Sequence, residues 1–361
     1  MRKIRVLIVD DSVVVRKIVS DSLSVDPEIE IAGLAANGKI GLAKIQQVNP
    51  DVVTMDIEMP EMDGLQALAE IRKIYPKLPV IMFSTLTERG GEKTLEALAL
   101  GATDYVTKPA NVGSVSIAMQ RVRDELIPKI KSFCSKAAGI APPVASRPAP
   151  MTTQATFQAR TPQTTVKSRI DIIAIGVSTG GPNALAELFP ALDPAKIPVP
   201  IVITQHMPPY FTKLLAERLS SKSRIPVKEG AAGETLKPGE AWIAPGDYHM
   251  CLERKGTSVQ ITTNQNPPEN SCRPAVDVML RSVVEIYGAH TLGVILTGMG
   301  QDGLIGCQQI KKSGGQVVAQ DEETSVVWGM PGFVTKDGLA DKVMPLQHIA
   351  GEIMFRLKYG R

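Results

Sequence analysis

The feature that most constrains the fold is a regular alternation of short apolar runs and helical patterns across residues 1–125. Apolar runs without polar alternation are typical of buried parallel strands. A repeated strand–helix pattern predicts a parallel sheet with helices on both faces. The expected strands are Val6–Val9, Ile29–Ala35, Val52–Met55, Val80–Phe83 and Tyr105–Thr107, and the expected helices lie near Val14–Leu23, Lys39–Val48, Leu65–Ile74, Glu92–Leu100 and Val115–Phe133.

A second alternation begins at Ile170 and predicts a doubly wound, mostly parallel α/β domain. Short runs between Trp242 and Thr262, separated by Pro-Gly-Asp and Lys-Gly, are typical of antiparallel hairpins. We therefore expect an antiparallel hairpin extension on this domain. The expected strands are Ile172–Ile175, Ile201–Thr204 and Leu292–Leu296, and the expected helices are Asn183–Leu192, Phe211–Leu219, Ala275–Ile286 and Leu304–Lys312.

The two alternations are separated by a segment of different composition. A chain of 361 residues is too long for one ordinary core, so two domains are expected. Residues 126–168 finish the last helix of the first domain and then become rich in Ala, Pro, Thr and Gln, which is typical of a flexible linker. The predicted organisation is a domain at 1–125, a tether at 126–168 and a second domain at 169–361.

Charge and cysteine usage exclude several classes of function. The net charge of +3 comes from the tether, which carries basic but no acidic residues, so no folded basic face is available for nucleic acid. No apolar run is long enough to insert into a membrane. The four cysteines form no CxxC and the four histidines no zinc pattern, which indicates reduced thiols and a cytoplasmic protein. Cys272 and Cys307 are interpreted as buried apolar side chains rather than nucleophiles.

Charged and polar residues follow the expected strands of the first domain. Asp10 and Asp11 follow the first strand, Asp56 the third, Ser84 the fourth and Lys108 the fifth. Ligands of parallel sheets bind at this carboxyl edge. Carboxylates that converge there repel one another, and a hard divalent cation such as Mg²⁺ offsets that repulsion.

The second domain places a serine in a glycine-rich turn. The strand Ile172–Ile175 runs into Gly176-Val177-Ser178-Thr179-Gly180-Gly181, and Pro182 suits the first turn of the following helix. A hydroxyl in such a turn lies near unpaired N–H groups and the positive end of a helix dipole. The turn can therefore hold either a nucleophile or a phosphate.

Two further strand ends favour the nucleophile. Strand Ile201–Thr204 leads into His206, and strand Leu292–Leu296 leads into a loop that contains Met299 and Asp302. An imidazole can deprotonate a serine, and a carboxylate on its other nitrogen fixes the tautomer. Asp302 can also cap the helix Leu304–Lys312. The chain order Ser178, His206, Asp302 differs from the Ser, acid, His order of α/β-hydrolases, so an ordinary lipase-like enzyme is disfavoured.

The acidic rim, Ser84 and Lys108-Pro109 resemble the receiver domain of two-component response regulators over residues 1–125. The resemblance implies a flavodoxin-like, five-stranded parallel sheet of order 2-1-3-4-5. It also implies that Asp56 accepts a phosphoryl group from a histidine kinase and that Mg²⁺ is required. The implied Mg²⁺ ligands are Asp10, Asp11, Asp56 and the backbone carbonyl of Glu58, and the implied switch residues are Ser84, Tyr105 and Lys108.

The second domain resembles the chemotaxis methylesterases of the CheB family. The resemblance is carried by IGVSTGGP at 175–182, ITQHMP at 203–208, RPAVDVM at 273–279, LTGMGQDG at 296–303 and VVWGMPG at 326–332. It implies a serine hydrolase that needs no cofactor and acts on glutamate methyl esters, and on certain glutamines, of transmembrane chemoreceptors. The implied roles are nucleophile for Ser178, general base and acid for His206, orienting acid for Asp302 and oxyanion donor for the Met299 N–H. We also expect a monomer in which phosphorylation of Asp56 relieves inhibition by the receiver.

Two other output functions remain as alternatives. The glycine-rich turn could cradle a nucleotide phosphate, although it lacks a Walker lysine and does not match GxGxxG. A DNA-binding output would need a basic helix-turn-helix, which the balanced charge of residues 169–361 does not favour.

Overall fold

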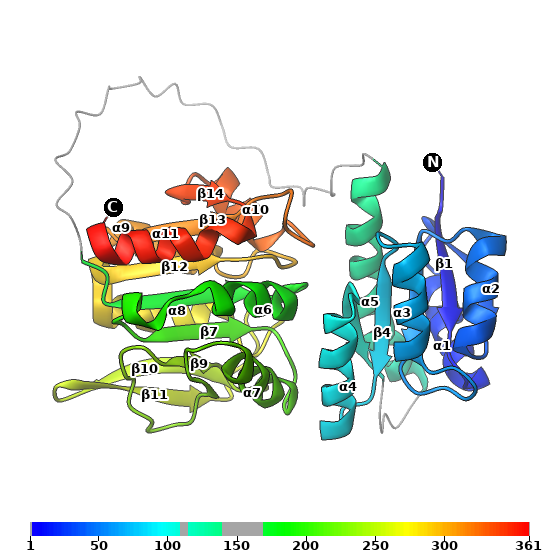
Figure 1. The fold of residues 1–361 in the computed structure, drawn as a ribbon, viewed down its shortest axis with the longest axis horizontal. Coiled ribbons are helices and arrows are strands. Elements are labelled where there is room, and N and C mark those ends of the chain that lie inside the picture. Colours follow the sequence, from blue (N-terminus) through cyan, green and yellow to red (C-terminus); the bar gives the residue numbers. More distant parts are fainter. Residues whose placement is uncertain (1, 109–114, 139–168, 361) are drawn as a thin grey trace, which may run out of the picture.

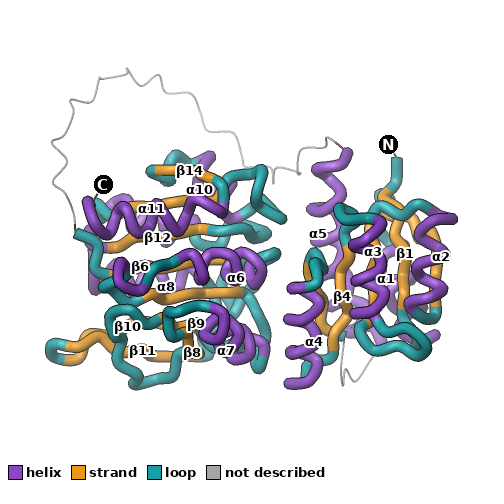
Figure 2. Tube along the Cα trace, viewed as in Figure 1, coloured by secondary structure: helices purple, strands orange, loops and turns teal. Residues whose placement is uncertain are grey.

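The computed structural model describes residues 2–108, 115–138 and 169–360, which form two α/β domains (Figure 1). Helices flank the strands of each domain, as Figure 2 shows by colour. The predicted fold class is confirmed for both domains. The tether predicted at 126–168 lies outside the described residues from 139 onwards. Among the described helices, none combines the length and the apolarity that a bilayer crossing requires.

The first domain is a five-stranded parallel sheet of order β2-β1-β3-β4-β5, which confirms the predicted order. Its central strands are fully buried because helices cover both faces. Side chains of Asn37, Asp63 and Thr87 cap the first turns of α2, α3 and α4. The elements are β1 (Ile4–Val9), α1 (Val13–Leu23), β2 (Ile29–Ala35), α2 (Gly38–Val48), β3 (Val52–Asp56), α3 (Gly64–Ile74), β4 (Val80–Ser84), α4 (Glu88–Ala99), β5 (Asp104–Thr107) and α5 (Val115–Ala138).

The second domain is built on a seven-stranded parallel sheet of order β14-β13-β12-β6-β7-β9-β8. Its three central strands are completely buried. The strands are β6 (Ile172–Val177), β7 (Ile201–Gln205), β8 (Val227–Glu229), β9 (Ala241–Ile243), β12 (Thr291–Ile295), β13 (Gln316–Gln320) and β14 (Lys342–Met344). The helices are α6 (Gly181–Ala191), α7 (Phe211–Lys222), α8 (Val276–Tyr287), α9 (Leu304–Lys312), α10 (Met330–Lys336) and α11 (Leu346–Tyr359), with short 3₁₀ turns at Pro194–Lys196 and Gly288–His290.

The hairpin prediction was correct for only part of its range. β10 (His249–Lys255) and β11 (Ser258–Asn264) form a separate antiparallel pair. Trp242 instead lies in β9, which pairs in parallel with β7 and β8 in the main sheet. The strand is three residues long, too short for its period to distinguish an edge position from a hairpin. The strands β13 and β14 and the helices α10 and α11 were not predicted.

The two domains contact each other through helix α4 of the first domain, which packs against α6 and α7 (Figure 1). The ring of Tyr105 stacks on the ring of Phe211 at the start of α7, with 5.3 Å between centroids. Gly91 of α4 lies so close to Leu214 that a Cβ there would be 2.7 Å from the leucine Cδ1. Met299 and Val327 of the second domain belong to an apolar cluster that also contains residues of the first domain. The interface therefore includes the loop edge of the second domain.

Candidate active site

The serine turn is held by backbone contacts on both sides. The Ser178 N–H donates to the Thr297 carbonyl over 3.0 Å, and the Gly181 N–H donates to the Ser178 carbonyl over 2.8 Å. Gln205 Nε2 also donates to the Ser178 carbonyl, over 3.0 Å. Gly180 has φ = 77° at the N-cap of α6, a conformation that favours glycine. Two N–H groups that could have bound a phosphate are thus used within the protein.

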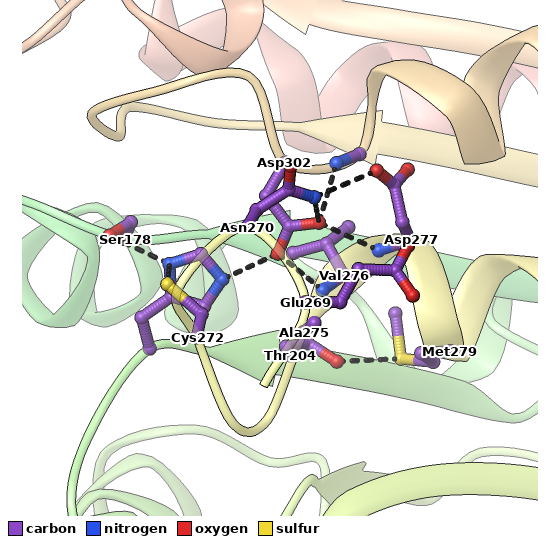
Figure 3. Close-up of polar contacts among 12 residues, drawn as sticks. Ser178, Thr204, Glu269, Asn270, Cys272, Ala275, Val276, Asp277, Met279 and Asp302 are labelled. Carbon is purple, nitrogen blue, oxygen red and sulfur yellow. Dashed lines mark hydrogen bonds and ion pairs between the residues drawn. The ribbon is translucent and has the colours of Figure 1, made fainter. Parts of the chain in front are cut away.

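The structure brings the side chains of Ser178, His206 and Asp302 together at the carboxyl edge of β6, β7 and β12. His206 Nδ1 lies 3.1 Å from Ser178 Oγ, and His206 Nε2 lies 2.7 Å from Asp302 Oδ2. Figure 3 shows Ser178 and Asp302 at opposite ends of this hydrogen-bonded chain. Because Nε2–H donates to the carboxylate, Nδ1 is the nitrogen that accepts the serine proton. This geometry suits deprotonation of the hydroxyl by imidazole.

Asp302 is buried and accepts hydrogen bonds from several donors. The backbone N–H groups of Val276 and Asp277 donate to it over 2.6 and 2.9 Å, and Asn270 Nδ2 over 3.0 Å. Burial raises the pKa of Asp302, but the bonds from His206 and from these N–H groups outweigh it, so the carboxyl stays ionised. The expected capping of α9 was wrong: that helix has no side-chain cap, and Asp302 serves the N-terminus of α8 instead.

Sequence reasoning missed the residues that support the aspartate. Asn270 Nδ2 bridges Asp302 Oδ1 and Asp277 Oδ2, at 3.0 and 3.1 Å. Asp277 in turn accepts from the Gly306 N–H over 2.7 Å. Asn270 and Ser271 both have positive φ, which tightens the loop that presents them. An Asn-Ser pair before Cys-Arg-Pro is typical of a turn and gives no sign of contact with Asp302.

Cys272 differs from its interpretation as a buried apolar side chain. It is half-buried, and its Sγ lies 3.4 Å from His206 Nδ1, whereas Cys307 is fully buried. Figure 3 shows Cys272 at the end of the hydrogen-bonded chain where Ser178 lies, opposite Asp302. Burial lowers the pKa of His206, but with the hydrogen bond to the Asp302 carboxylate as the largest raising effect, that pKa lies above the usual value.

Met299 follows a glycine that approaches the serine very closely. A Cβ on Gly298 would be 2.9 Å from Ser178 Cβ and 2.4 Å from Met330 Sδ. The Gly298 N–H donates to the Val327 carbonyl. Within the described residues, the Met299 N–H has no hydrogen-bond acceptor, and Met299 directly follows the glycine that approaches Ser178. Met330 itself is fully buried.

The acidic rim of the first domain is a candidate cation site. Carboxylate oxygens of Asp10, Asp11 and Asp56 all lie within 4.8 Å of one another, a hard-oxygen donor set that fits Mg²⁺. Burial raises the pKa values of Asp10 and Asp56 more than Lys108 lowers them. A bound cation would stabilise the ionised form of both carboxylates. Lys108 Nζ is 2.7 Å from Asp56 Oδ2, and the Glu58 N–H donates to Asp56 Oδ1 over 3.4 Å.

The other two candidate residues of the first domain, Ser84 and Tyr105, lie near the second domain. Ser84 Oγ donates to the Gly90 carbonyl over 3.1 Å and accepts from Thr94 Oγ1 over 2.6 Å, both in α4. Tyr105 is buried in the domain interface against Phe211. Ser84 therefore contacts α4 rather than the Asp56 carboxylate in this structure.

Together, the fold and sites define a class: a five-stranded α/β domain with an acidic edge, joined to a second α/β domain that brings a serine, a histidine and an aspartate together. Residues 173–353 match the CheB methylesterase family model, and residues 6–120 match the response regulator receiver domain. The chain belongs to the CheB methylesterase family and is a hydrolase.

Relatives and solved structures agree with this assignment. The protein-glutamate methylesterase/protein-glutamine glutaminase of Trichodesmium erythraeum is 54% identical, covering 99% of this chain and 100% of that protein. The protein of the same name from Pyrococcus abyssi is 43% identical, covering 96% of this chain and 92% of that protein. The Thermotoga maritima CheB methylesterase catalytic domain is 46% identical, with a TM-score of 0.50, covering 52% of this chain and 98% of that chain.

Proposed function

We propose that this chain hydrolyses glutamate methyl esters, and deamidates particular glutamines, on chemotaxis receptors in the cytoplasm, under control of Asp56 phosphorylation by a histidine kinase. The observation that carries the proposal is the continuous chain Ser178 Oγ–His206–Asp302, with distances of 3.1 and 2.7 Å. The curated relatives carry the name of this activity. The nucleotide-binding alternative is disfavoured because N–H groups of the glycine-rich turn donate to the protein's own carbonyls.

The catalytic cycle uses the chain's own residues and water. His206 Nδ1 takes the proton of Ser178 Oγ as the oxygen attacks the ester carbonyl carbon. The Met299 N–H stabilises the resulting oxyanion, a contribution of about 3 kcal/mol for such a donor. His206 then gives the proton to the departing methoxide, and methanol leaves. Water attacks the acyl-serine by the same steps, regenerating Ser178 and releasing the glutamate side chain; with a glutamine substrate, ammonia leaves instead.

Asp302 supports this cycle by keeping the imidazole oriented. Its charge stabilises the imidazolium that forms when Ser178 loses its proton. The carboxylate is fixed by hydrogen bonds from the Val276 N–H, the Asp277 N–H and Asn270. It therefore does not have to change position when His206 takes up the serine proton. Asp302 and His206 are therefore preorganised for the reaction before the substrate binds.

In the receiver, Asp10, Asp11, Asp56 and the Glu58 carbonyl would hold Mg²⁺. The ion would neutralise charge between the Asp56 carboxylate and an incoming phosphoryl group. Lys108, 2.7 Å from Asp56, supplies a second positive charge on the same rim. These charges support Asp56 as the phosphoacceptor.

Phosphorylation would reach the second domain through α4. A phosphoryl group on Asp56 attracts the Ser84 hydroxyl, which must then give up its bond to the Gly90 carbonyl in α4. The Glu58–Lys93 ion pair, at 2.6 Å, also links the phosphorylation loop to this helix. Because α4 packs on α6 and α7 and Tyr105 stacks on Phe211, movement there loosens the cover over the catalytic edge.

Methanol release from methylated receptor membranes tests the proposal directly. Ser178→Ala should abolish release both with and without a phosphodonor. Asp56→Asn should keep the unstimulated rate and lose the stimulation by the phosphodonor and Mg²⁺. Methanol release by the Ser178→Ala protein at the unaltered rate would contradict the assigned nucleophile.

A further inference from the structure

Two hydrogen donors compete for one nitrogen in the active site. His206 Nδ1 lies 3.1 Å from Ser178 Oγ and 3.4 Å from Cys272 Sγ. A neutral imidazole whose Nε2–H is bound to Asp302 offers one lone pair at Nδ1. The thiol and the hydroxyl therefore share a single base, and the base that activates the serine can equally take a proton from the cysteine.

The loop that carries Cys272 is firmly anchored. Residues Glu269 and Cys272 exchange backbone hydrogen bonds in both directions, at 3.1 and 2.9 Å. The Glu269 carboxylate makes two bonds of 2.6 Å with the Arg281 guanidinium. Asn270, which lies between Glu269 and Cys272 in the chain, donates a hydrogen bond to Asp302. The sulfur is consequently held beside the imidazole.

In the described part of the chain, none of the other three cysteines is hydrogen-bonded to a histidine. Cys134 and Cys307 are buried, and burial raises the pKa values of both thiols, that of Cys134 to about 12. Burial also raises the pKa of Cys251, which is bonded to the Asn264 amide at 3.7 Å. Thiolate is the reactive form of cysteine. Cys272 is half-buried, next to the exposed Ser271, so a small reagent can approach it.

We propose that Cys272 is a modification site for small disulfides and other soft electrophiles, and that its modification reversibly switches off the esterase. This inference rests on the proposed function, since it concerns the same histidine. His206 Nδ1 takes the Sγ–H proton, and the thiolate attacks one sulfur of a disulfide RSSR. The new Cys272–SR bond forms as the S–S bond breaks, and the departing thiolate RS⁻ leaves with the proton from His206 as RSH.

The modification would stop catalysis by occupying space. The added group starts from a sulfur 3.4 Å from Nδ1, on the side of the ring that Ser178 also faces. The serine hydroxyl, the substrate carbonyl and the new group cannot all occupy this region. A displacement of about 1 Å between nucleophile and base can lower the rate about 100-fold. A thiol reductant removes the group and restores the free imidazole.

The test treats the full chain with methyl methanethiosulfonate, which transfers an S–CH₃ group to thiolates and releases methanesulfinate. We expect the treated protein to release methanol from methylated receptor at least tenfold more slowly, and dithiothreitol to restore the rate. Peptide mass analysis should find the added S–CH₃ on Cys272. Each variant is scored as the ratio of its treated to its untreated rate.

Matched variants separate the possible causes. Cys272→Ser should give a ratio near one. Cys251→Ala removes the other half-buried thiol, and its ratio should fall on treatment as much as that of the unaltered protein. Inactivation of Cys272→Ser, or full activity of protein modified at Cys272, would overturn the inference. The inference is also overturned if the untreated protein releases methanol but the reagent leaves Cys272 unmodified. If the untreated protein releases no methanol, the proposed function fails instead.

Discussion

His206 is the base of the proposed reaction, so its pKa should set the pH dependence of the rate. Burial lowers its pKa, but the hydrogen bond to the Asp302 carboxylate opposes burial, and the pKa lies above the ordinary value of about 6.5. A raised pKa keeps the imidazole protonated to higher pH, and only the neutral ring can accept the serine proton. We therefore expect kcat/KM for methyl-ester hydrolysis to rise with pH through a midpoint above 6.5.

The matched variant for this pH profile is Asp302→Asn. It removes the negative charge that favours the imidazolium, so its remaining activity should rise at lower pH than that of the unaltered protein. Activity that reaches its plateau below pH 6.5 in the unaltered protein would contradict a His206 base with a raised pKa. The measurement is methanol release over a series of buffers at constant ionic strength.

Gly298 is the second residue whose environment makes a sharp prediction. A methyl group there would meet Ser178 Cβ at 2.9 Å and Met330 Sδ at 2.4 Å, so either the serine turn or the following Met299 backbone must shift. We expect Gly298→Ala to reduce methanol release by about tenfold or more, because the reacting groups lose their alignment.

Gly351→Ala is the control for this substitution. Gly351 lies in α11 with nothing within 4 Å of an added Cβ, so the change should leave activity intact and stabilise the helix by at most about 1 kcal/mol. Both variants are compared by thermal unfolding and by Ser178 labelling with a fluorophosphonate. Normal labelling of a folded Gly298→Ala protein would show that close packing at this glycine is dispensable.

At the scale of elements, α4 is the helix that joins the two sites. It supplies Gly90 and Thr94 to Ser84, and it packs its Gly91 against Leu214 of α7. We expect Gly91→Leu to force α4 away from α7 and to raise methanol release by the unphosphorylated protein severalfold. Leucine has a higher helix propensity than glycine, so α4 itself should not be weakened.

Glu92→Leu introduces the same side chain at the next, exposed position of α4 and serves as the control. It should leave unstimulated methanol release unchanged. Equal rates for Gly91→Leu, Glu92→Leu and the unaltered protein would mean that the α4–α7 contact does not restrain the esterase.

For the whole molecule, the question is whether the receiver covers the catalytic edge. The second domain has its own seven-stranded sheet and its own apolar core, so residues 169–361 can be studied alone. Met299 and Val327 near the catalytic loops pack in a cluster shared with the receiver. We expect the 169–361 fragment to release methanol faster than the unphosphorylated full chain. An equal or slower fragment would contradict occlusion by the receiver.

The order of the first sheet was implied by the resemblance to receiver domains. The residues by themselves determined the two α/β domains and the strand ends that carry Ser178, His206 and Asp302. These features depend on local patterns: apolar runs that mark buried strands, and polar residues that directly follow them. The comparisons confirm the family and the fold. The roles of the individual residues stay predictions.

Only the tertiary structure decided what surrounds those residues. Asn270, Cys272 and Asp277 reach the site from a loop and a helix start whose sequence predicts no contact with His206 or Asp302. β9 joined the main sheet because its pairing depends on distant neighbours rather than on its own three residues. Tyr105 meets Phe211 only because the two domains pack against each other. Such contacts arise from three-dimensional proximity, which local periodicity and propensity do not encode.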